Sequence, residues 1–164
     1  SGDRKLIIDF RNNTGGYLDS AVDMVSWFLP AGKVIVTEDY GKNADPTIYR
    51  SRGYNLATNN LKVVILVNEY SASASEIFVG ALKDYNVAKL VGMKTYGKGS
   101  VQELMPITED SILKVTVAKW FTPNRHSISL NGDVPDYEVK LTDDDIKNQK
   151  DPQFDKAMLI IQSL

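Results

Sequence analysis

The feature that most constrains the fold is an uninterrupted run of mostly apolar, β-branched residues at positions 62–67. A run of this kind, without polar alternation, is typical of a central strand that is covered on both faces, as in parallel sheets. It is followed almost at once by Ser71-Ala72-Ser73-Ala74-Ser75-Glu76, where a helical apolar pattern begins that extends over residues 74–85. The sequence therefore predicts a strand–turn–helix junction that is rich in small hydroxyl side chains.

The rest of the chain alternates between strand and helix patterns. Further strands are predicted at residues 5–10 (as a buried strand), 34–36, 90–91, 101–104 and 112–118, and further helices at residues 19–29 and from Pro152 onward with Asp151 as N-cap. Residues 39–60 are polar and are predicted to form an irregular surface excursion. We therefore expect an α/β layered core with central, largely parallel strands flanked by helices, followed by a C-terminal β-hairpin region and a terminal helix.

Composition excludes several classes of function. The 164 residues suffice for one domain, and a net charge of −2 without basic clusters provides no field for nucleic acid. The sequence has no cysteine, which excludes disulfides and a thiolate nucleophile, and the single His126 excludes a multi-histidine metal site. No segment approaches the roughly 18 apolar residues of a membrane span.

The three serines of the junction have two interpretations. Ser71, Ser73 and Ser75 can simply satisfy the free amides at the start of a helix, which is the usual role of such residues. Alternatively, one of them is a nucleophile, because the first amides of the helix are suitable oxyanion donors. The turn at Gly15-Gly16 follows another predicted strand and offers a second donor from a neighbouring loop.

Lys98 lies between Gly97 and Gly99, so little bulk surrounds its amine. A lysine that is kept neutral can act as the base for a serine nucleophile, without a histidine triad. Because a lysine in water has a pKa of about 10.4, this role requires burial away from carboxylates, and we expect the pKa of Lys98 to be lowered. A phosphate-binding loop is disfavoured, because Gly99 stands where that motif needs a hydroxyl for Mg²⁺; a solvated loop lysine is the simpler alternative.

Three blocks of the sequence resemble the carboxyl-terminal processing peptidases, also called tail-specific proteases. They are Leu6-Ile7-Ile8-Asp9-Phe10-Arg11-Asn12-Asn13-x-Gly15-Gly16, Val67-Asn68-x-x-Ser71-Ala72-Ser73-Ala74-Ser75-Glu76-Ile77 and Thr95-Tyr96-Gly97-Lys98-Gly99-Ser100-Val101-Gln102. The resemblance extends over residues 5–139 in the same order, and it departs from the family at Thr14, often proline there, and at Asn124-Arg125-His126. It implies a core related to the crotonase-like fold.

The resemblance also implies the roles of individual residues. Ser73 corresponds to the nucleophile, Lys98 to the general base and Gln102 to the residue that orients the lysine. The oxyanion donors correspond to the amide of Ala74 and to one amide of the Gly15-Gly16 turn, with the choice between the two glycines left open. Ser71 and Ser75 then keep helix-start roles.

A serine endopeptidase that cleaves polypeptides near their C-termini through an acyl-enzyme is the implied activity, with no metal or organic cofactor. Members of the family act outside the cytoplasm, in the periplasm, at the cell surface or in the chloroplast lumen, and normally carry an upstream PDZ domain and further core segments. We expect the chain to divide into a cloning remnant (1–2), a catalytic core that lacks those upstream parts (3–140) and a helical extension (141–164). Whether the chain is active without them is left open.

Two alternatives accompany this interpretation. One is a catalytically silent scaffold of the same fold that holds peptide as an added strand, although such a module has no need of Ser73, Lys98 and Gln102 together. The other concerns the last helix, whose Ile160 and Ile161 form either a homodimer contact or, as we expect, part of the domain's own core.

Overall fold

The computed structural model describes residues 4–42, 44–54, 60–129 and 131–164. Its helices and strands are, in chain order, β1 (Arg4–Asp9), α1 (Leu18–Ser26), β2 (Val34–Asp39), β3 (Thr47–Arg50), β4 (Leu61–Val67), α2 (Ala74–Asp84), β5 (Ala88–Gly92), β6 (Ser100–Thr108), β7 (Ser111–Phe121), β8 (Tyr137–Glu138), α3 (Asp143–Lys147) and α4 (Pro152–Ser163). The strands form a parallel sheet in the order β1-β4-β5-β8 and an antiparallel sheet in the order β3-β2-β7-β6.

The central strand of the parallel sheet, β4, is buried on both faces. Val63, Ile65 and Val67 contribute to the core that contains α1 and α2, while Val64 and Leu66 pack with residues of α4. Each such side chain contributes about 1.5–3 kcal/mol through burial. The prediction of a central, doubly covered strand is therefore confirmed.

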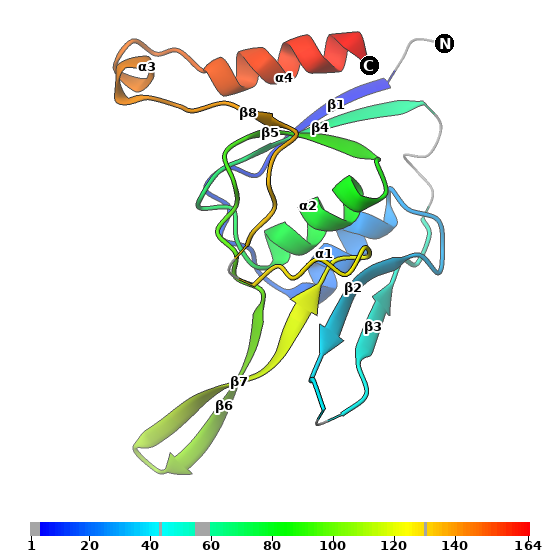
Figure 1. Ribbon diagram of the computed structural model, residues 1–164, viewed down its shortest axis with the longest axis vertical. Helices are drawn as coiled ribbons and strands as arrows, with labels where there is room; N and C mark the ends of the chain where they lie inside the picture. The colour runs from blue at the N-terminus through cyan, green and yellow to red at the C-terminus, as the bar shows by residue number, and fades with distance from the viewer. Residues whose placement is uncertain (1–3, 43, 55–59, 130) are drawn as a thin grey trace.

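Helices cover both faces of the parallel sheet. Figure 1 shows α4 above it and α1 with α2 below it, between the two sheets. The core on the lower side contains three phenylalanines: Phe10 stacks on Phe78 at 4.9 Å between ring centroids, and Phe28 meets Phe78 edge-on at 5.7 Å. These contacts hold the residue after β1 against α2, the helix that begins within the serine cluster.

The antiparallel sheet ends in two hairpins that extend away from the helices (Figure 1). The longer hairpin, β6–β7, pairs from Ser100↔Lys119 to Thr108↔Ser111. It contains the two strands predicted at residues 101–104 and 112–118, and both extend beyond the predicted bounds. Its register shifts between Val101 and Gln102, which is an irregularity of the β-bulge type. Several of its large apolar side chains are exposed, among them Leu104, Ile107 and Ile112.

Some expectations need correction. The strand at residues 5–10 exists, but β1 is an edge strand of the described sheet rather than a buried one, because only β4 pairs with it, and Leu6 is 37% exposed. The segment 39–60, expected to be irregular, contains β3, which pairs with β2. The sequence patterns also miss β8 and α3, which are very short. Residues 43 and 55–59 of that segment, and residues 1–3, lie outside the described residues.

The terminal helix follows its prediction closely. Asp151 caps α4 by accepting a hydrogen bond from the amide of Phe154 at 2.9 Å, and Pro152 is the first helical residue. Ile160 and Ile161 are buried against β4 and β5 together with Ala157, so they belong to the domain's own core. In the described part of the chain, no helix has the length and apolar character needed to cross a membrane.

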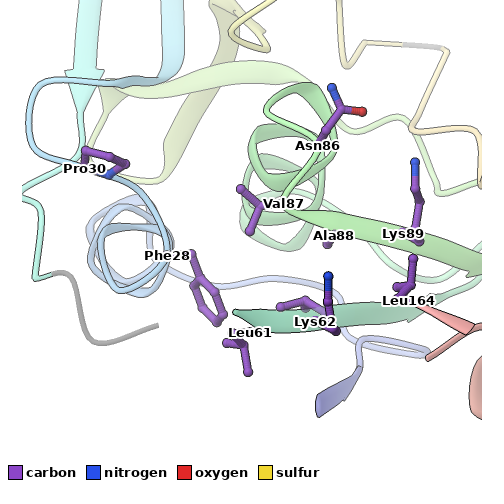
Figure 2. A pocket seen from close by; sticks show the side chains of 10 residues that line it. Phe28, Pro30, Leu61, Lys62, Asn86, Val87, Ala88, Lys89 and Leu164 are labelled. Atoms are coloured by element: carbon purple, nitrogen blue, oxygen red, sulfur yellow. The ribbon is translucent and has the colours of Figure 1, made fainter. Parts of the chain in front are cut away.

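A pocket of about 400 Å³ opens where β4 and β5 begin (Figure 2). Its floor is apolar, with Phe28, Leu61 and Val87, and its polar groups are Asn86, Lys62 and Lys89. This lining contains neither a serine nor a carboxylate side chain, and its ionisable side chains are the two lysines. The serine cluster lies at the opposite, carboxyl end of the same strands.

Candidate active site

Three loops meet at the carboxyl end of the parallel sheet, which is where open α/β sheets usually bind ligands. They follow β1, β4 and β5. Asn12 and Asn68 join the first two loops through reciprocal bonds of 2.9 Å, one from the amide of Asn12 and one from the side chain of Asn68. The amide of Ala72 donates to the carbonyl of Asn13 at 3.0 Å, and that of Tyr96 donates to the carbonyl of Ser71 at 3.0 Å. The loops therefore hold one another in place.

The three serines of the cluster differ in exposure. Ser71 is fully buried, and its hydroxyl donates to the carbonyl of Phe10 at 2.8 Å and accepts from the amide of Asn68 at 3.0 Å. Ser75 is also buried, and its Oγ has no hydrogen-bond partner among the described residues. Ser73 is only partly buried. Of the three, Ser73 is the one that a substrate can approach.

Ser73 also has an unusual backbone. It occupies the N-cap position of α2 with φ 60° and ψ −121°, in a region that favours glycine. A strained residue at a sharp strand-to-helix turn, with its side chain presented above the sheet, is typical of nucleophilic serines in other hydrolases. Strain of this kind costs about 1–3 kcal/mol and persists where the surroundings enforce it.

The glycine turn after β1 packs directly against this residue. Gly15 has φ +94°, and a Cβ on it would lie 2.5 Å from the carbonyl oxygen of Ala72 and 2.8 Å from the amide nitrogen of Ala74. The amide of Gly15 donates to Oδ1 of Asn13 at 3.0 Å. Within the described residues, the amides of Gly16 and Ala74 have no hydrogen-bond partner.

The carboxylate of Glu76 joins the serine junction to the lysine loop. Glu76 is fully buried, and its Oε2 accepts from the amides of Ser73 and Lys98, each at 2.9 Å. Its Oε1 accepts from the hydroxyl of Thr95 and from the amide of Gly97, each at 2.6 Å. One oxygen atom therefore holds the backbones of Ser73 and Lys98 side by side.

Lys98 and Gln102 lie close to this junction in the chain, but both side chains are exposed. In the described parts of the chain, no hydrogen bond is formed by the amine of Lys98 or by the side chain of Gln102. The burial expected for Lys98 from the sequence is therefore not provided by the described residues. Gln102 lies at the register shift of β6, a feature that commonly redirects side chains near active sites.

A small pocket of about 100 Å³ adjoins the serine junction. It lies between the glycine turn, the first turns of α1 and the start of α2, and its lining includes Gly16, Ala21, Met24, Ala74 and Phe78. The lining contains no ionisable group apart from the phenol of Tyr17, which is exposed. The pocket therefore suits a small apolar side chain.

Two participants of the junction are missed by reasoning from the sequence, namely Glu76 and Thr95. Glu76 has a sequence signal, since Ser73-x-x-Glu76 has the spacing of a capping box, in which the glutamate bonds to the amide of the N-cap residue. Thr95 has no such signal, because its role depends on tertiary contact. Among the described residues, no group of three or more histidines, cysteines or carboxylates is suited to hold a metal ion.

Comparisons with known proteins identify the family of this chain. The family model described as peptidase family S41 matches residues 1–139. A probable CtpA-like serine protease of Staphylococcus aureus is 46% identical over 138 residues, which are 84% of this chain and 28% of that protein. Its counterpart in Staphylococcus saprophyticus is 44% identical over 139 residues, with 85% and 28% covered.

Solved structures are similar as well. The photosystem II D1 C-terminal processing protease superposes with a TM-score of 0.75 at 32% identity, covering 83% of this chain and 34% of that one. A putative S41 protease from Bacteroides fragilis superposes with a TM-score of 0.76 at 22% identity, covering 98% and 45%, and supports the fold alone. The chain thus spans only about a quarter to a half of the lengths of these relatives.

Proposed function

Because this chain belongs to peptidase family S41, we propose that it is the catalytic part of a serine endopeptidase that works with the pair Ser73 and Lys98. The family includes C-terminal processing serine proteases among its members. The chain covers 28% of the length of its curated relatives, so the activity, substrates and partners of the whole protein are part of this proposal.

The observation that carries the proposal is the shared bond to Glu76. Ser73 and Lys98 come from different loops, and their amides donate to the same carboxylate oxygen. A nucleophile and its base must be held in fixed relation for proton transfer. The burial of Ser71 and Ser75 supports Ser73 as the nucleophile for the same junction.

In the proposed reaction, neutral Lys98 takes the hydroxyl proton of Ser73 as Oγ attacks the carbonyl carbon of the scissile bond. The amides of Ala74 and Gly16, which lack other partners in the described chain, stabilise the resulting oxyanion; Gly15 gives the close approach but uses its own amide on Asn13. Protonated Lys98 then delivers the proton to the leaving amine, which leaves an ester on Ser73. Water hydrolyses this ester by the same steps.

Lys98 needs to be neutral for this role. Because its side chain is exposed, a cover that excludes water from the amine has to come from outside the described residues. We propose that bound polypeptide covers the amine, which excludes water and disfavours the charged form. Gln102 then orients the amine by a hydrogen bond. The apolar pocket beside Ala74 receives a small side chain that precedes the scissile bond.

We extend the proposal to four further properties that the family resemblance implies. They comprise a crotonase-like core, cleavage near accessible polypeptide C-termini, an upstream PDZ domain that presents these tails and an extracytoplasmic location. The similarity to the D1 C-terminal processing protease supports the choice of substrate end. A homodimer stays a prediction, and Ile160 and Ile161 do not support it because the domain buries them itself.

Peptide cleavage by variants tests the proposal. Ser73→Ala and Lys98→Ala are each expected to reduce kcat/KM for a peptide with alanine before the scissile bond by about 10³-fold or more, with an unchanged unfolding curve. Ser75→Ala is the matched control, because the Ser75 hydroxyl is buried and makes no hydrogen bond to the described residues, and it should retain activity. Activity that survives in Ser73→Ala would move the nucleophile elsewhere and refute the proposal.

A further inference from the structure

A buried carboxyl group outside the proposed catalytic pair faces the same helix as Glu76. Asp133 lies in the segment that leads to β8, and its Oδ2 is buried without a hydrogen-bond partner in the described chain. The carboxyl packs over α2 at Gly80, where a Cβ would lie 3.1 Å from Oδ1 and 3.5 Å from Oδ2. Gly80 is one helical turn after Glu76, so the two carboxyl groups approach the same stripe of α2.

The backbone of Asp133 is connected to the junction through Thr95. The amide of Asp133 donates to Oγ1 of Thr95 at 2.6 Å, and its carbonyl accepts from the amide of Thr95 at 3.1 Å. The hydroxyl of Thr95 in turn donates to Glu76 at 2.6 Å. Gly132 packs so tightly on Thr95 that a Cβ there would lie 2.4 Å from its carbonyl oxygen. Asp133 thus supports the loop that carries Lys98.

We propose that Asp133 is a positioning residue for the Ser73–Lys98 pair. While its carboxyl group is neutral, Asp133 holds Thr95 and the loop that carries Lys98 on Glu76, and it releases them when the carboxyl group ionises. The effect of Asp133 on catalysis rests on the proposed function. Its effect on the attachment of residues 95–98 to α2 does not depend on that function.

The surroundings explain why ionisation would loosen the contact. Burial, followed by the nearby charge of Glu76, raises the pKa of Asp133 to about 7, with Asp84 acting in the same direction and Lys83 against it. All three charged groups lie on α2, and the ammonium of Lys83 is already engaged by the carbonyl of Val134. From the loops, the uncharged Thr95 bonds to the amide of Asp133, and the uncharged Thr122 lies beside Gly80, on which the carboxyl group packs. An ionised Asp133 therefore faces Glu76 without a partner of its own in the described chain.

Proton linkage determines whether the attachment becomes stronger or weaker as the pH rises. A carboxyl group whose pKa is higher in the folded than in the unfolded chain stabilises the fold at low pH, and this contribution is lost as the pH rises toward about 7. The segment should therefore detach more readily at pH 8 than at pH 6. Asp133→Asn, which stays neutral at every pH, should not show this loss.

Amide hydrogen exchange in a Ser73→Ala background tests the structural part without any need for catalysis. The protection factors of the Gly97 and Lys98 amides should fall by about tenfold between pH 6 and pH 8. They should stay within about threefold once Asp133→Asn is added. Asp110→Asn is the control, because Asp110 is exposed in the β6–β7 turn, and it should behave like the parent. An equal fall with and without Asp133→Asn, or no fall in the parent, overturns the inference.

Two further arms complete the test. Should Asp133→Asn fail to unfold cooperatively, Asp133→Ser removes the carboxyl by a different route, and a flat protection profile is again the expected result. With Ser73 intact, the rate of phosphonate labelling at pH 8 relative to pH 6 should be higher in Asp133→Asn than in the parent. Absence of labelling in every variant would contradict the proposed function, whereas the exchange data would still decide the role of Asp133.

Discussion

At the scale of single residues, the junction depends on Glu76. Three backbone amides and one hydroxyl donate to a carboxylate that is fully buried. Buried donors that lose their acceptor cost about 1–3 kcal/mol each. The four hydrogen bonds to Glu76 together therefore stabilise the fold far more than any one of them does. The same contacts hold the strained backbone of Ser73 in place.

Replacing Glu76 should therefore affect stability and activity together. Glu76→Ala is expected to lower the free energy of unfolding by about 3 kcal/mol or more, because three amides lose their acceptor inside the protein. Urea unfolding measures this loss, with Ser75→Ala as a neighbouring control that removes no bond within the described chain. A loss below about 1 kcal/mol would contradict the role given to Glu76.

The two adjacent glycines give a second test at this scale. Gly15→Ala should destabilise the chain by about 2 kcal/mol or more, since its φ of +94° is unfavourable for alanine and its Cβ would collide with the backbone at Ala72 and Ala74. Gly16→Ala should change stability far less, because a Cβ there meets nothing within 4 Å. Equal effects in thermal unfolding would show that the turn does not pack on the serine junction as described.

At the scale of elements, the strands and helices with a marked apolar pattern follow the sequence, whereas β3, β8 and α3 do not. The apolar run of β4 and the helical pattern of α2 are long enough to determine their own structure. In contrast, β8 has two residues and forms only by pairing with β5, which no local pattern encodes. The apolar residues of β1 indicate a strand but not how many neighbours it has, so they do not distinguish an edge strand from a buried one.

The same limit applies to the candidate site. Sequence similarity singles out Ser73 among three serines, but the burial of Ser71 and Ser75 follows only from the assembly of the loops. The exposure of Lys98 has no signal in the sequence, because burial depends on what covers a loop rather than on its own residues. Thr95 and Asp133 meet only through tertiary contact, far apart in the sequence.

At the scale of the whole molecule, α4 is fastened to the site end of the parallel sheet by one charged cluster. Arg11, which follows β1, contacts Asp9 at 2.7 Å and Asp151 at 2.8 Å, and also bonds to Gln153 at 3.1 Å. Gln153 in turn donates to the carbonyl of Val139 at 2.8 Å. The outer helix is thereby connected both to β1 and to the segment after β8.

This cluster predicts a loss of stability in acid. The hydrogen bond from Arg11 holds the pKa of Asp151 below its usual value, so its contribution is present above about pH 4 and is lost as the pH falls further. Asp151→Asn keeps a cap acceptor for α4 but removes the charge, and its unfolding temperature should fall less than that of the parent between pH 5 and pH 3. A parallel decline in both proteins would contradict the assignment.

In the proposed function, Lys98 activates Ser73 across the junction that Glu76 holds together. The most direct test is mass spectrometry of this chain, extended to the length of its relatives, after reaction with a serine-directed phosphonate. We expect one adduct per chain, on Ser73, which is lost in Lys98→Ala and retained in Ser75→Ala. An adduct on Ser71 or Ser75 would contradict the role of Ser73 and move the nucleophile to that residue. No adduct on the extended protein would contradict the proposal altogether and favour a silent peptide-binding scaffold.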